Sequence, residues 1–296
     1  MKRYGYRFLI QCWKLNPLKR LTRNIIRKLN IPIDRFYKDT RYIGNFSVKL
    51  NQQKFQLYNP GDTTIENEVF WKGIDHSWEP ISLDIWRKLC KKSHIILDIG
   101  ANSGIYTVLA ATINSNAKIF AFEPVIRTRN LLKQNIEINN FKNVTSFHQA
   151  VSDKTGTAIF HDVTSSSQYS ASLNKDVLHS LPKEIKTTYS IETIRLDDLS
   201  EINQLPVDLI KLDVELHELE AMVGMRSIIQ KNKPSILVEI LNDTIGNQIE
   251  KELEGLGYVF YNIDEVNPPK ITHKLSKSNF YNFLICQPNI AHSLGL

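Results

Sequence analysis

The first residues that could do chemistry lie in the segment DIGANSG at 98–104, between a short apolar run and a helical pattern. Glycines in such a turn let a backbone come close to a bound ligand, since a side chain would collide with it. Glu123 ends the next apolar run, about 20 residues further on, where a doubly wound fold places the acidic group that hydrogen-bonds ribose hydroxyls. The spacing therefore predicts a site for a cofactor that contains a nucleoside.

The details of this turn indicate which cofactor it binds. A dinucleotide fold needs the pattern G-x-G-x-x-G so that the pyrophosphate can lie at a helix N-terminus, but Asn102 stands at the middle glycine position. The Gly-Lys-Ser/Thr of a phosphate-binding loop is also absent from the sequence here. Asp98 would repel a pyrophosphate and suits a cationic ligand. We therefore predict S-adenosyl-L-methionine, which has a sulfonium, an amino group and a ribose but no phosphate. A nicotinamide dehydrogenase is the alternative enzyme class.

Polar residues also follow two later apolar runs, at 207–215 and 235–240. Ligands of open α/β sheets bind beyond the carboxyl ends of the strands, so this second group should face the transferred methyl group. Methyl transfer to an alcohol needs a base that removes the hydroxyl proton, and a histidine or a carboxylate could serve. The predicted catalytic residues are Lys211, Asp213, Glu215, His217 and Glu239.

A structural explanation of the same residues stays open. Asp213 and Glu215 could stabilise the N-terminus of the following helix electrostatically, and His217 could be a capping residue at its start. Lys211 could neutralise the carboxylates or steer an anionic substrate. Asp, Glu and His side chains together could hold a divalent metal, but their number and spacing match no metal-site signature, so we predict no metal.

The charge of the chain is distributed unevenly. The 296 residues carry a net charge of +6, but residues 1–30 hold nine of the 37 Lys and Arg and none of the 31 Asp and Glu. The rest is slightly acidic, whereas enzymes that act on nucleic acid more often carry basic residues across their working face, so we predict no nucleic-acid partner. The three cysteines lie far apart without zinc-ligand spacing, which favours a reducing compartment. Since no apolar run is long enough to span a membrane, we predict a cytoplasmic protein.

The N-terminal residues predict a basic amphipathic helix. An Asn-Pro dipeptide at 16–17 is typical of a helix start, and Leu18, Leu21 and Ile25 recur at helical spacing among basic residues. The helix could pack on the flank of the domain with its charges in solvent. Alternatively, residues 1–30 could make a peripheral contact with an anionic membrane surface. The segment lacks the apolar core and the cleavage site of a secretory signal.

From residue 95 onward, apolar runs alternate with helical patterns. The runs are short and rich in Val, Ile and Phe, which is typical of a parallel sheet covered on both faces. Earlier, alternation at 46–58 predicts a β-hairpin, and a helix should begin near Pro80. A Ser-rich stretch at 164–174 is either a substrate-side loop or a plain surface loop. The predicted strands are 95–99, 118–124, 144–151, 207–215, 235–240, 258–264 and 282–286, and the predicted helices are 106–113, 127–139, 218–230 and 245–256.

Several segments between residues 66 and 286 form an ordered set: EVFWKGIDHSWEP, ILDIGANSGIYT, AFEP, QNIEINNFKNV, AVSDKTG, IRLDDL, VDLIKLDVE and PSILVEI. This set resembles the FkbM family of S-adenosylmethionine-dependent methyltransferases. The resemblance implies an α/β fold of the class I methyltransferase, Rossmann-like type, with a doubly wound, mostly parallel sheet in residues 66–296. Residues 1–65 would form an extension made of the basic helix and the β-hairpin.

The resemblance also implies where the cofactor binds. The glycine turn would border its methionine part, Glu123 would hold the ribose, and the segment 150–153 would lie by the adenine. Together with the acidic residue before the turn, the expected cofactor-binding residues are Asp98, Gly100, Asn102, Gly104, Glu123, Ala150, Val151 and Asp153.

The reaction implied by the resemblance is O-methylation of a hydroxyl on a glycan or a small-molecule acceptor such as a secondary metabolite. One residue departs from the family pattern, because members usually have glycine after Asp-Val-Glu and this chain has Leu216. Glycine would permit a tight turn or a close approach of the substrate. Leu216 therefore indicates either a more apolar acceptor pocket or an altered activity. The alternative function is a cofactor-binding, catalytically weak scaffold associated with a membrane.

Overall fold

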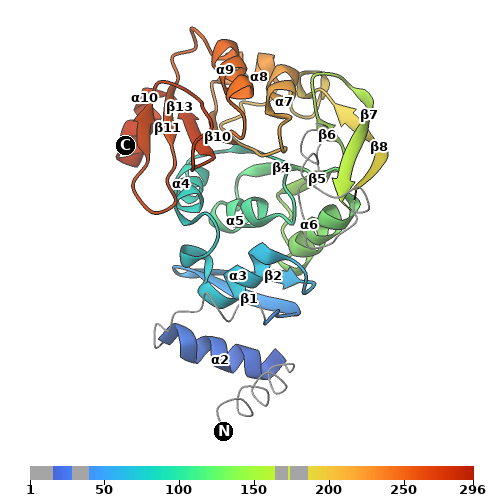
Figure 1. Cartoon of the computed structure of the whole chain (residues 1–296), viewed down its shortest axis with the longest axis vertical. Coiled ribbons are helices and arrows are strands. Elements are labelled where there is room, and N and C mark those ends of the chain that lie inside the picture. Colours follow the sequence, from blue (N-terminus) through green and yellow to red (C-terminus); the bar gives the residue numbers. More distant parts are fainter. Residues whose placement is uncertain (1–15, 29–39, 164–172, 174–185) are drawn as a thin grey trace. The chain divides into compact units, whose positions relative to one another are not determined.

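The computed structural model describes residues 16–28, 40–163, 173 and 186–296 (Figure 1). The chain divides into two compact units, Met1–Pro80 and Ile81–Leu296. This division lies beyond residue 65, where the sequence suggests a boundary, because the helices α3 (Thr64–Lys72) and η1 (Ile74–His76) contact the N-terminal hairpin. Apart from residue 173, the Ser-rich stretch at 164–174 is outside the described residues.

The first unit is built on the predicted β-hairpin. β1 (Gly44–Leu50) and β2 (Gln53–Asn59) pair antiparallel across a turn at Asn51, whose φ is 52°. Alternate residues of β1 are buried, as its apolar periodicity predicts. α3 contributes Phe70, whose ring stacks on Tyr42 with 4.0 Å between the centroids and meets Phe46 edge-on at 5.4 Å. β1, Tyr42 before it and α3 therefore share one aromatic core.

The helix α2 (Asn16–Lys28) directs described basic side chains toward this unit. Lys19 is buried and donates to a backbone carbonyl, while Arg20 donates to the hydroxyl of Tyr42 over 2.7 Å. The guanidinium of Arg23 lies 4.7 Å from the ring centroid of Phe70. Lys19 therefore departs from the expectation of a helix packed with its charges in solvent, whereas Arg20 is exposed and Arg23 is partly buried. The carbonyl, the phenol and the aromatic face compensate these three groups.

The apolar stripe of α2 lies on its other side. Leu18, Leu21 and Ile25 are 36%, 58% and 47% exposed. Their spacing of three and four residues places them on one face of the helix. Across the described residues, none of the helices is both long enough and apolar enough to cross a membrane.

The second unit contains an eight-stranded sheet in the order β12-β11-β13-β10-β9-β3-β4-β5. β3 is central, with β4 and β5 on one side and β9 and β10 on the other, all parallel. This is the doubly wound arrangement that the sequence predicts, and β13 pairs antiparallel between β10 and β11. The bounds are β3 (Ile95–Ile99), β4 (Lys118–Phe122), β5 (Val144–Phe147), β9 (Leu209–Leu212), β10 (Ser235–Glu239), β11 (Val259–Asn262), β12 (Lys270–Thr272) and β13 (Asn282–Cys286).

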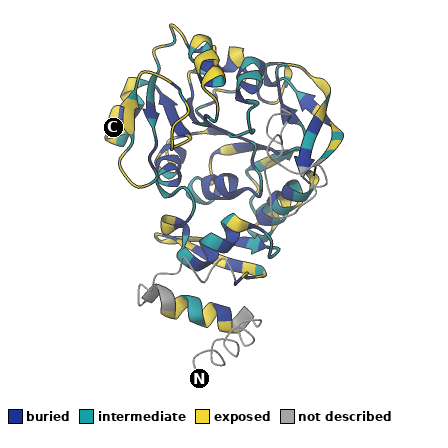
Figure 2. Cartoon of the chain, in the orientation of Figure 1, coloured by how far each residue is buried: buried dark blue, intermediate teal, exposed yellow. Residues whose placement is uncertain are grey.

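Helices cover both faces of this sheet, and its central strands are buried (Figures 1 and 2). The first face carries α4 (Pro80–Cys90), α5 (Ile105–Ile113) and α6 (Ile126–Ile138), and the second carries α7 (Glu218–Gly224), α8 (Arg226–Asn232) and α9 (Asp243–Glu252). The single helix predicted at 218–230 is two helices, because the backbone leaves helical geometry at Met225. α10 (Pro288–Leu294) ends the described chain.

The run predicted as one strand at 144–151 is divided between two sheets. β5 belongs to the large sheet, whereas β6 (Ala150–Val151) pairs with β8 (Lys186–Ile194), which also pairs with β7 (Gly156–Val163). β7 and β8 lie in the long connection before β9, where the sequence predicts no strand. The change of sheet brings the segment after β5 into contact with α7.

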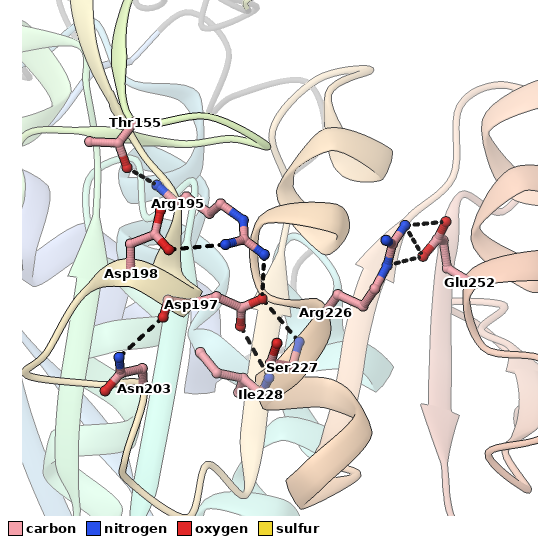
Figure 3. Close-up of polar contacts among 9 residues, drawn as sticks. All are labelled: Thr155, Arg195, Asp197, Asp198, Asn203, Arg226, Ser227, Ile228 and Glu252. Carbon is pink, nitrogen blue, oxygen red and sulfur yellow. Dashed lines mark hydrogen bonds and ion pairs between the residues drawn. The ribbon is translucent and has the colours of Figure 1, made fainter.

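The motif IRLDDL contains a carboxylate that fastens α8 to this connection. Asp197, in the short helix η4 (Leu196–Asp198), accepts hydrogen bonds from the backbone N–H groups of Ser227 and Ile228 at 3.0 and 3.2 Å (Figure 3). Arg195 donates to the same carboxylate over 3.0 Å. Asp197 therefore supplies the N-terminal cap of α8 from a distant part of the chain.

Replacing Asp197 by alanine should lower the free energy of unfolding by about 2–3 kcal/mol, because it removes the cap and the partner of a half-buried guanidinium. The matched control is Asp198→Ala, whose carboxylate is 56% exposed and pairs with the same Arg195. That control should cost at most about 1 kcal/mol. Denaturant unfolding of both variants measures the difference, and equal losses would contradict the assignment.

Candidate active site

The glycine turn follows β3 and lies against the end of β9. Gly100 has a φ of 80°, and a Cβ atom there would lie 1.7 Å from the carbonyl oxygen of Asp213. Gly104 has a φ of 91°, and its Cβ would lie 2.4 Å from Cδ1 of Leu132. The packing of the protein itself therefore requires glycine at position 100, whereas at position 104 the close atom ends a side chain and the positive φ is the main constraint.

Glu123 follows β4 and is held beside the glycine turn. Its Oε2 accepts from the N–H of Asn102 over 2.7 Å, and its Oε1 accepts from the N–H of Val125 and the hydroxyl of Thr128, both at 2.9 Å. Burial raises the pKa of Glu123 to about 7, while these donors oppose the rise. A carboxylate offers about four acceptor positions, so one remains on Oε2 for a further donor.

Asp98 lies at the end of β3 and is buried. It accepts a hydrogen bond from the hydroxyl of Thr107 in α5, and it stands opposite Lys211 in the parallel pairing of β3 with β9. Burial raises its pKa to about 6, and Lys211 acts against this rise. The turn therefore begins on a carboxyl group that is anchored to the following helix.

The predicted catalytic group comes together around Lys211 at the carboxyl ends of β9 and β10. The side chain of Lys211 is 2% exposed, and its Nζ lies 3.0 Å from Oδ2 of Asp213 and 5.0 Å from the ring centroid of Tyr106. Glu215 and Glu239 interact electrostatically with both Lys211 and Asp213. The site thus combines one buried ammonium with several carboxyl groups.

This surplus of carboxyl groups perturbs their protonation. Burial, followed by repulsion from Asp213, raises the pKa of Glu215 to about 7. For Glu239 burial, Asp213 and Glu215 together raise the pKa to about 10, and Lys211 acts in the opposite direction. Near neutral pH, Glu239 therefore keeps its proton whereas Glu215 is divided between its two forms.

The loop after β9 has a strained backbone. Glu215 and Leu216 have φ values of 54° and 71°, a left-handed conformation that costs a residue with a side chain about 1–2 kcal/mol. Glu218 holds this loop, because its Oε1 accepts from the N–H groups of Val214 and Leu216, both at 3.2 Å. The positive φ at position 216 explains why glycine suits it.

His217, the remaining predicted catalytic residue, faces a different set of groups. Its Nε2 lies 3.0 Å from the hydroxyl of Ser152, and its Nδ1 lies 3.5 Å from the carboxylate of Glu220. Burial lowers its pKa, while Glu220 and Asp153 act to raise it. The structure thus joins His217 to the segment after β5, which contains the expected adenine-side residues.

That segment presents a polar side chain beside two buried apolar residues. Ala150 and Val151 form β6 and are buried, while Asp153 is half-buried and accepts a hydrogen bond from Ser152 over 3.2 Å. The sequence assigned no individual role to four groups that support the site. The position of Tyr106 and Thr107 in the first turn of the helix after the glycine turn could have indicated that their side chains lie near the site. The four supporting groups are Tyr106, Thr107, Ser152 and Glu218.

Comparison with known proteins decides what this arrangement belongs to. The model of the methyltransferase FkbM domain matches residues 98–260, which is more than half of the chain and runs from Asp98 through both groups of site residues. The chain belongs to the FkbM methyltransferase family. Membership confirms the resemblance seen in the sequence, and with it S-adenosyl-L-methionine as the cofactor of the family.

Two characterised proteins are similar in sequence to this FkbM family member. Hexuronic acid methyltransferase AglP of Haloferax volcanii is 26% identical over 174 residues, which cover 58% of this chain and 66% of AglP. The 2-O-methyltransferase NoeI of Sinorhizobium fredii is 28% identical over 155 residues, covering 48% of this chain and 62% of NoeI. The chain therefore spans somewhat less than two thirds of the length of each relative.

Solved structures with a similar arrangement are more distant. The methyltransferase FkbM of Methylobacillus flagellatus KT aligns with a TM-score of 0.42 and 15% identity over 65% of this chain and 43% of its own. An S-adenosylmethionine-dependent methyltransferase of Agrobacterium tumefaciens aligns with a TM-score of 0.47 and 10% identity over 83% and 70%. The fold assignment of this FkbM chain rests on its own strand order.

The residues of this FkbM chain fit the cofactor of its family. The acceptor position that remains on Oε2 of Glu123 can take a ribose hydroxyl, since a carboxylate accepts such donors well. The carboxyl groups near Lys211 outnumber the nearby cation, which favours a ligand with an ammonium and a sulfonium group. Among the described residues, no cluster of His, Cys, Asp or Glu is arranged to hold a metal ion.

Replacing Glu239 by glutamine should reduce the decrease in the free energy of unfolding that occurs as the pH rises. The pKa of Glu239 is about 10 in the fold against 4.5 for an ordinary glutamate, so the folded chain keeps a proton that the unfolded chain loses. The free energy of unfolding therefore falls as the pH rises through this window. Because glutamine does not ionise, we expect Glu239→Gln to stabilise by about 2–4 kcal/mol more near pH 8 than near pH 5.

Denaturant unfolding across this pH range measures that effect. Glu254→Gln is the matched control, because it changes an exposed carboxylate in the turn after α9 and should leave the pH dependence as it is. A parallel pH dependence in Glu239→Gln and the parent would mean that Glu239 ionises normally in the fold.

Proposed function

We propose that this chain transfers a methyl group from S-adenosyl-L-methionine to a hydroxyl of a glycan or a small molecule. The observation that carries the proposal is the buried Lys211 among Asp213, Glu215 and Glu239, at the carboxyl edge of the sheet beside the glycine turn. When bound, the cofactor supplies an electrophilic methyl group on a sulfonium. The names of AglP and NoeI, a hexuronic acid methyltransferase and a 2-O-methyltransferase, support a sugar hydroxyl as the acceptor.

The protonation states suggest separate roles for the carboxyl groups. Glu215 is the proposed base, since a pKa of about 7 suits a group that must take a proton near neutral pH. Glu239 keeps its proton and can donate a hydrogen bond to the acceptor, while Lys211 holds Asp213 in place. As the carbon–oxygen bond forms and the carbon–sulfur bond breaks, the hydroxyl proton passes to Glu215 and then to solvent.

Calorimetry tests the cofactor half of this proposal. The parent should bind S-adenosylhomocysteine at micromolar concentration and should not bind NADH. Glu123→Gln should weaken this binding about tenfold or more, because the amide cannot replace a carboxylate that accepts a ribose hydroxyl. Glu137→Gln, on the exposed side of α6, is the matched control. Binding of NADH in place of S-adenosylhomocysteine would favour the dehydrogenase class instead.

Transfer of radiolabelled methyl groups tests the reaction itself. Glycans with and without hexuronic acid residues are incubated with the protein and S-adenosyl-L-methionine, and the labelled product is counted. Glu215→Gln should lower kcat about 100-fold or more and leave the affinity for S-adenosylhomocysteine within about twofold. Binding without turnover on any hydroxylated acceptor would favour the scaffold function over the enzyme.

We also propose that the exposed face of α2 touches an anionic membrane. Leu18, Leu21 and Ile25 offer an apolar stripe to the surroundings, in a segment of 30 residues with nine basic and no acidic residues. An apolar face in a basic segment is typical of helices that lie in the plane of a membrane surface. Since Lys19, Arg20 and Arg23 are engaged with the first unit, the apolar residues should supply most of the described contact.

Vesicle sedimentation tests this contact. The chain should bind vesicles of phosphatidylglycerol and phosphatidylcholine, more weakly at high salt, and scarcely bind phosphatidylcholine alone. The double variant Leu21→Ser, Ile25→Ser should lose most of this binding, whereas Ile43→Ser, at an exposed isoleucine of the same unit, should not. If the double variant instead changes the oligomeric state, the face binds a second copy and the membrane proposal fails.

A further inference from the structure

His217 begins α7 and connects two parts of the site. In the sequence, His217 directly follows the strained loop after β9, which contains Glu215. Its side chain contacts Ser152, which follows β6. Ser152 is buried and its N–H donates to the carbonyl of Ile194 over 3.0 Å, so its backbone position is set by β8. The imidazole therefore links the loop that contains Glu215, the proposed base, to the segment that follows β6.

The hydrogen bonds form a directed chain. The hydroxyl of Ser152 donates to Oδ1 of Asp153 over 3.2 Å, so its oxygen must accept from Nε2–H of His217 at 3.0 Å. This order assigns the proton of the neutral imidazole to Nε2. The other ring nitrogen, Nδ1, lies 3.5 Å from the carboxylate of Glu220, so both nitrogens of His217 already face groups of the protein.

Backbone packing reinforces the same connection. Gly224, at the end of α7, approaches Ser152 so closely that a Cβ atom would lie 2.0 Å from the carbonyl oxygen of Ser152. The helix α7 thus contacts this segment at both of its ends, through the side chain of His217 and the backbone at Gly224. A helix fixed at two points leaves little freedom to the backbone at Ser152 and Asp153.

Asp153 is suitably placed to recognise the base of a nucleoside. Glu123, the proposed ribose partner, follows β4, and Asp153 follows β6, six residues beyond the end of β5, the strand next to β4. The contact of Ser152 with His217 holds this segment near the loop after β9. A nucleoside whose ribose binds at the end of β4 can extend its base toward the end of β5, because ligands lie along the carboxyl edge of such sheets. A carboxylate there accepts a hydrogen bond from an exocyclic amino group.

We propose that His217 is a positioning residue that, through Ser152, orients Asp153 toward the base of the cofactor and thereby sets cofactor affinity and base specificity. This inference rests on the proposed function. It replaces the prediction that His217 is the base of the reaction and leaves proton transfer to Glu215. The affected quantities are the Kd and KM for the cofactor, and kcat is unaffected.

The test compares three variants with the parent in calorimetry. His217→Ala and Ser152→Ala should each weaken the binding of S-adenosylhomocysteine about tenfold, the loss expected for a charge-assisted hydrogen bond that is no longer oriented. His217→Gln should restore most of the affinity, because its amide N–H can donate to Ser152. His148→Ala, at a half-exposed histidine that pairs with Glu192, is the control and should bind as the parent does.

A second measurement separates orientation from general damage. S-inosylhomocysteine has an oxo group in place of the exocyclic amino group, so the parent should prefer S-adenosylhomocysteine by about tenfold. His217→Ala should lose this preference while its kcat stays within about twofold and its KM for S-adenosyl-L-methionine rises. Circular dichroism and thermal unfolding identify any variant that has failed to fold, and Ser152→Ala then carries the test.

Two results would overturn the inference. A fall in kcat of His217→Ala with unchanged Kd would make His217 the base after all. Unchanged affinity and unchanged base preference in both His217→Ala and Ser152→Ala would leave the hydrogen-bond chain without this role. A parent that binds no S-adenosylhomocysteine would instead refute the proposed function, so the two failures are distinguishable.

Discussion

Gly100→Ala is expected to prevent the chain from reaching its native fold, or to lower the free energy of unfolding by at least about 4 kcal/mol. A Cβ atom at this position would lie 1.7 Å from the carbonyl oxygen of Asp213, and the φ of 80° is itself unfavourable for alanine. The left-handed conformation of alanine costs about 1–2 kcal/mol of the free energy of unfolding. The overlap costs more, because the backbone at the ends of two central strands must move apart. A domain with a typical stability of about 5–15 kcal/mol has little reserve for this loss.

Gly255→Ala is the matched control for this substitution. Its φ of 76° is similar, but no atom lies within 4 Å of its Cβ position. It should therefore show only the conformational cost, about 1 kcal/mol. Soluble yield and denaturant unfolding of the two variants measure the difference. Equal stabilities would mean that the end of β9 can move away from the glycine turn at little cost.

Lys211→Met should destabilise the chain by about 3–5 kcal/mol and strongly lower the rate of methyl transfer. The substitution preserves the length of the side chain but deletes the buried ammonium 3.0 Å from Asp213, which leaves the neighbouring carboxyl groups without their cation. Breaking one partner of a buried pair is costly because the other charge stays desolvated. The pKa of Glu215 should rise as well, since Lys211 is the group that lowers it, so less of the proposed base would be ionised.

The pH dependence distinguishes this effect from simple unfolding. In Lys211→Met, remaining activity should increase toward alkaline pH and any loss of stability should be smaller at low pH, where the carboxyl groups are protonated. Lys118→Met, at an exposed lysine that begins the neighbouring strand β4, should change neither quantity. A stable, active Lys211→Met protein with the pH dependence of the parent would show that the ammonium is dispensable.

Much of the fold could be predicted from local sequence patterns. The hairpin at 46–58, the helix that begins at Pro80 and the parallel strands from 95 onward were all visible, because side chains two or four residues apart share a face. The glycine turn and Glu123 could also be predicted, from their position at the ends of strands. Both follow short apolar runs, and the carboxyl ends of parallel strands meet at one edge of a sheet.

Other elements depended on partners that are remote in the chain. The run at 144–151 is divided between two sheets because β6 pairs with β8, over 40 residues later. α2 has the predicted helical periodicity, yet Arg23 packs on Phe70 and the leucines face outward, because the surface offered by the first unit is aromatic and rich in acceptors. Periodicity identifies a helical face without identifying what that face meets.

The sequence by itself determined which residue types stand at the strand ends, and so the cofactor class and the grouping of Lys211 with Asp213, Glu215 and Glu239. Only the tertiary structure decided what each side chain does there. It showed Gly100 packed against Asp213, Glu218 holding the loop after β9, and His217 bonded to Ser152. The reason is physical: strands and turns form from near neighbours, whereas the partner of a polar side chain is whichever group the fold brings within hydrogen-bonding distance.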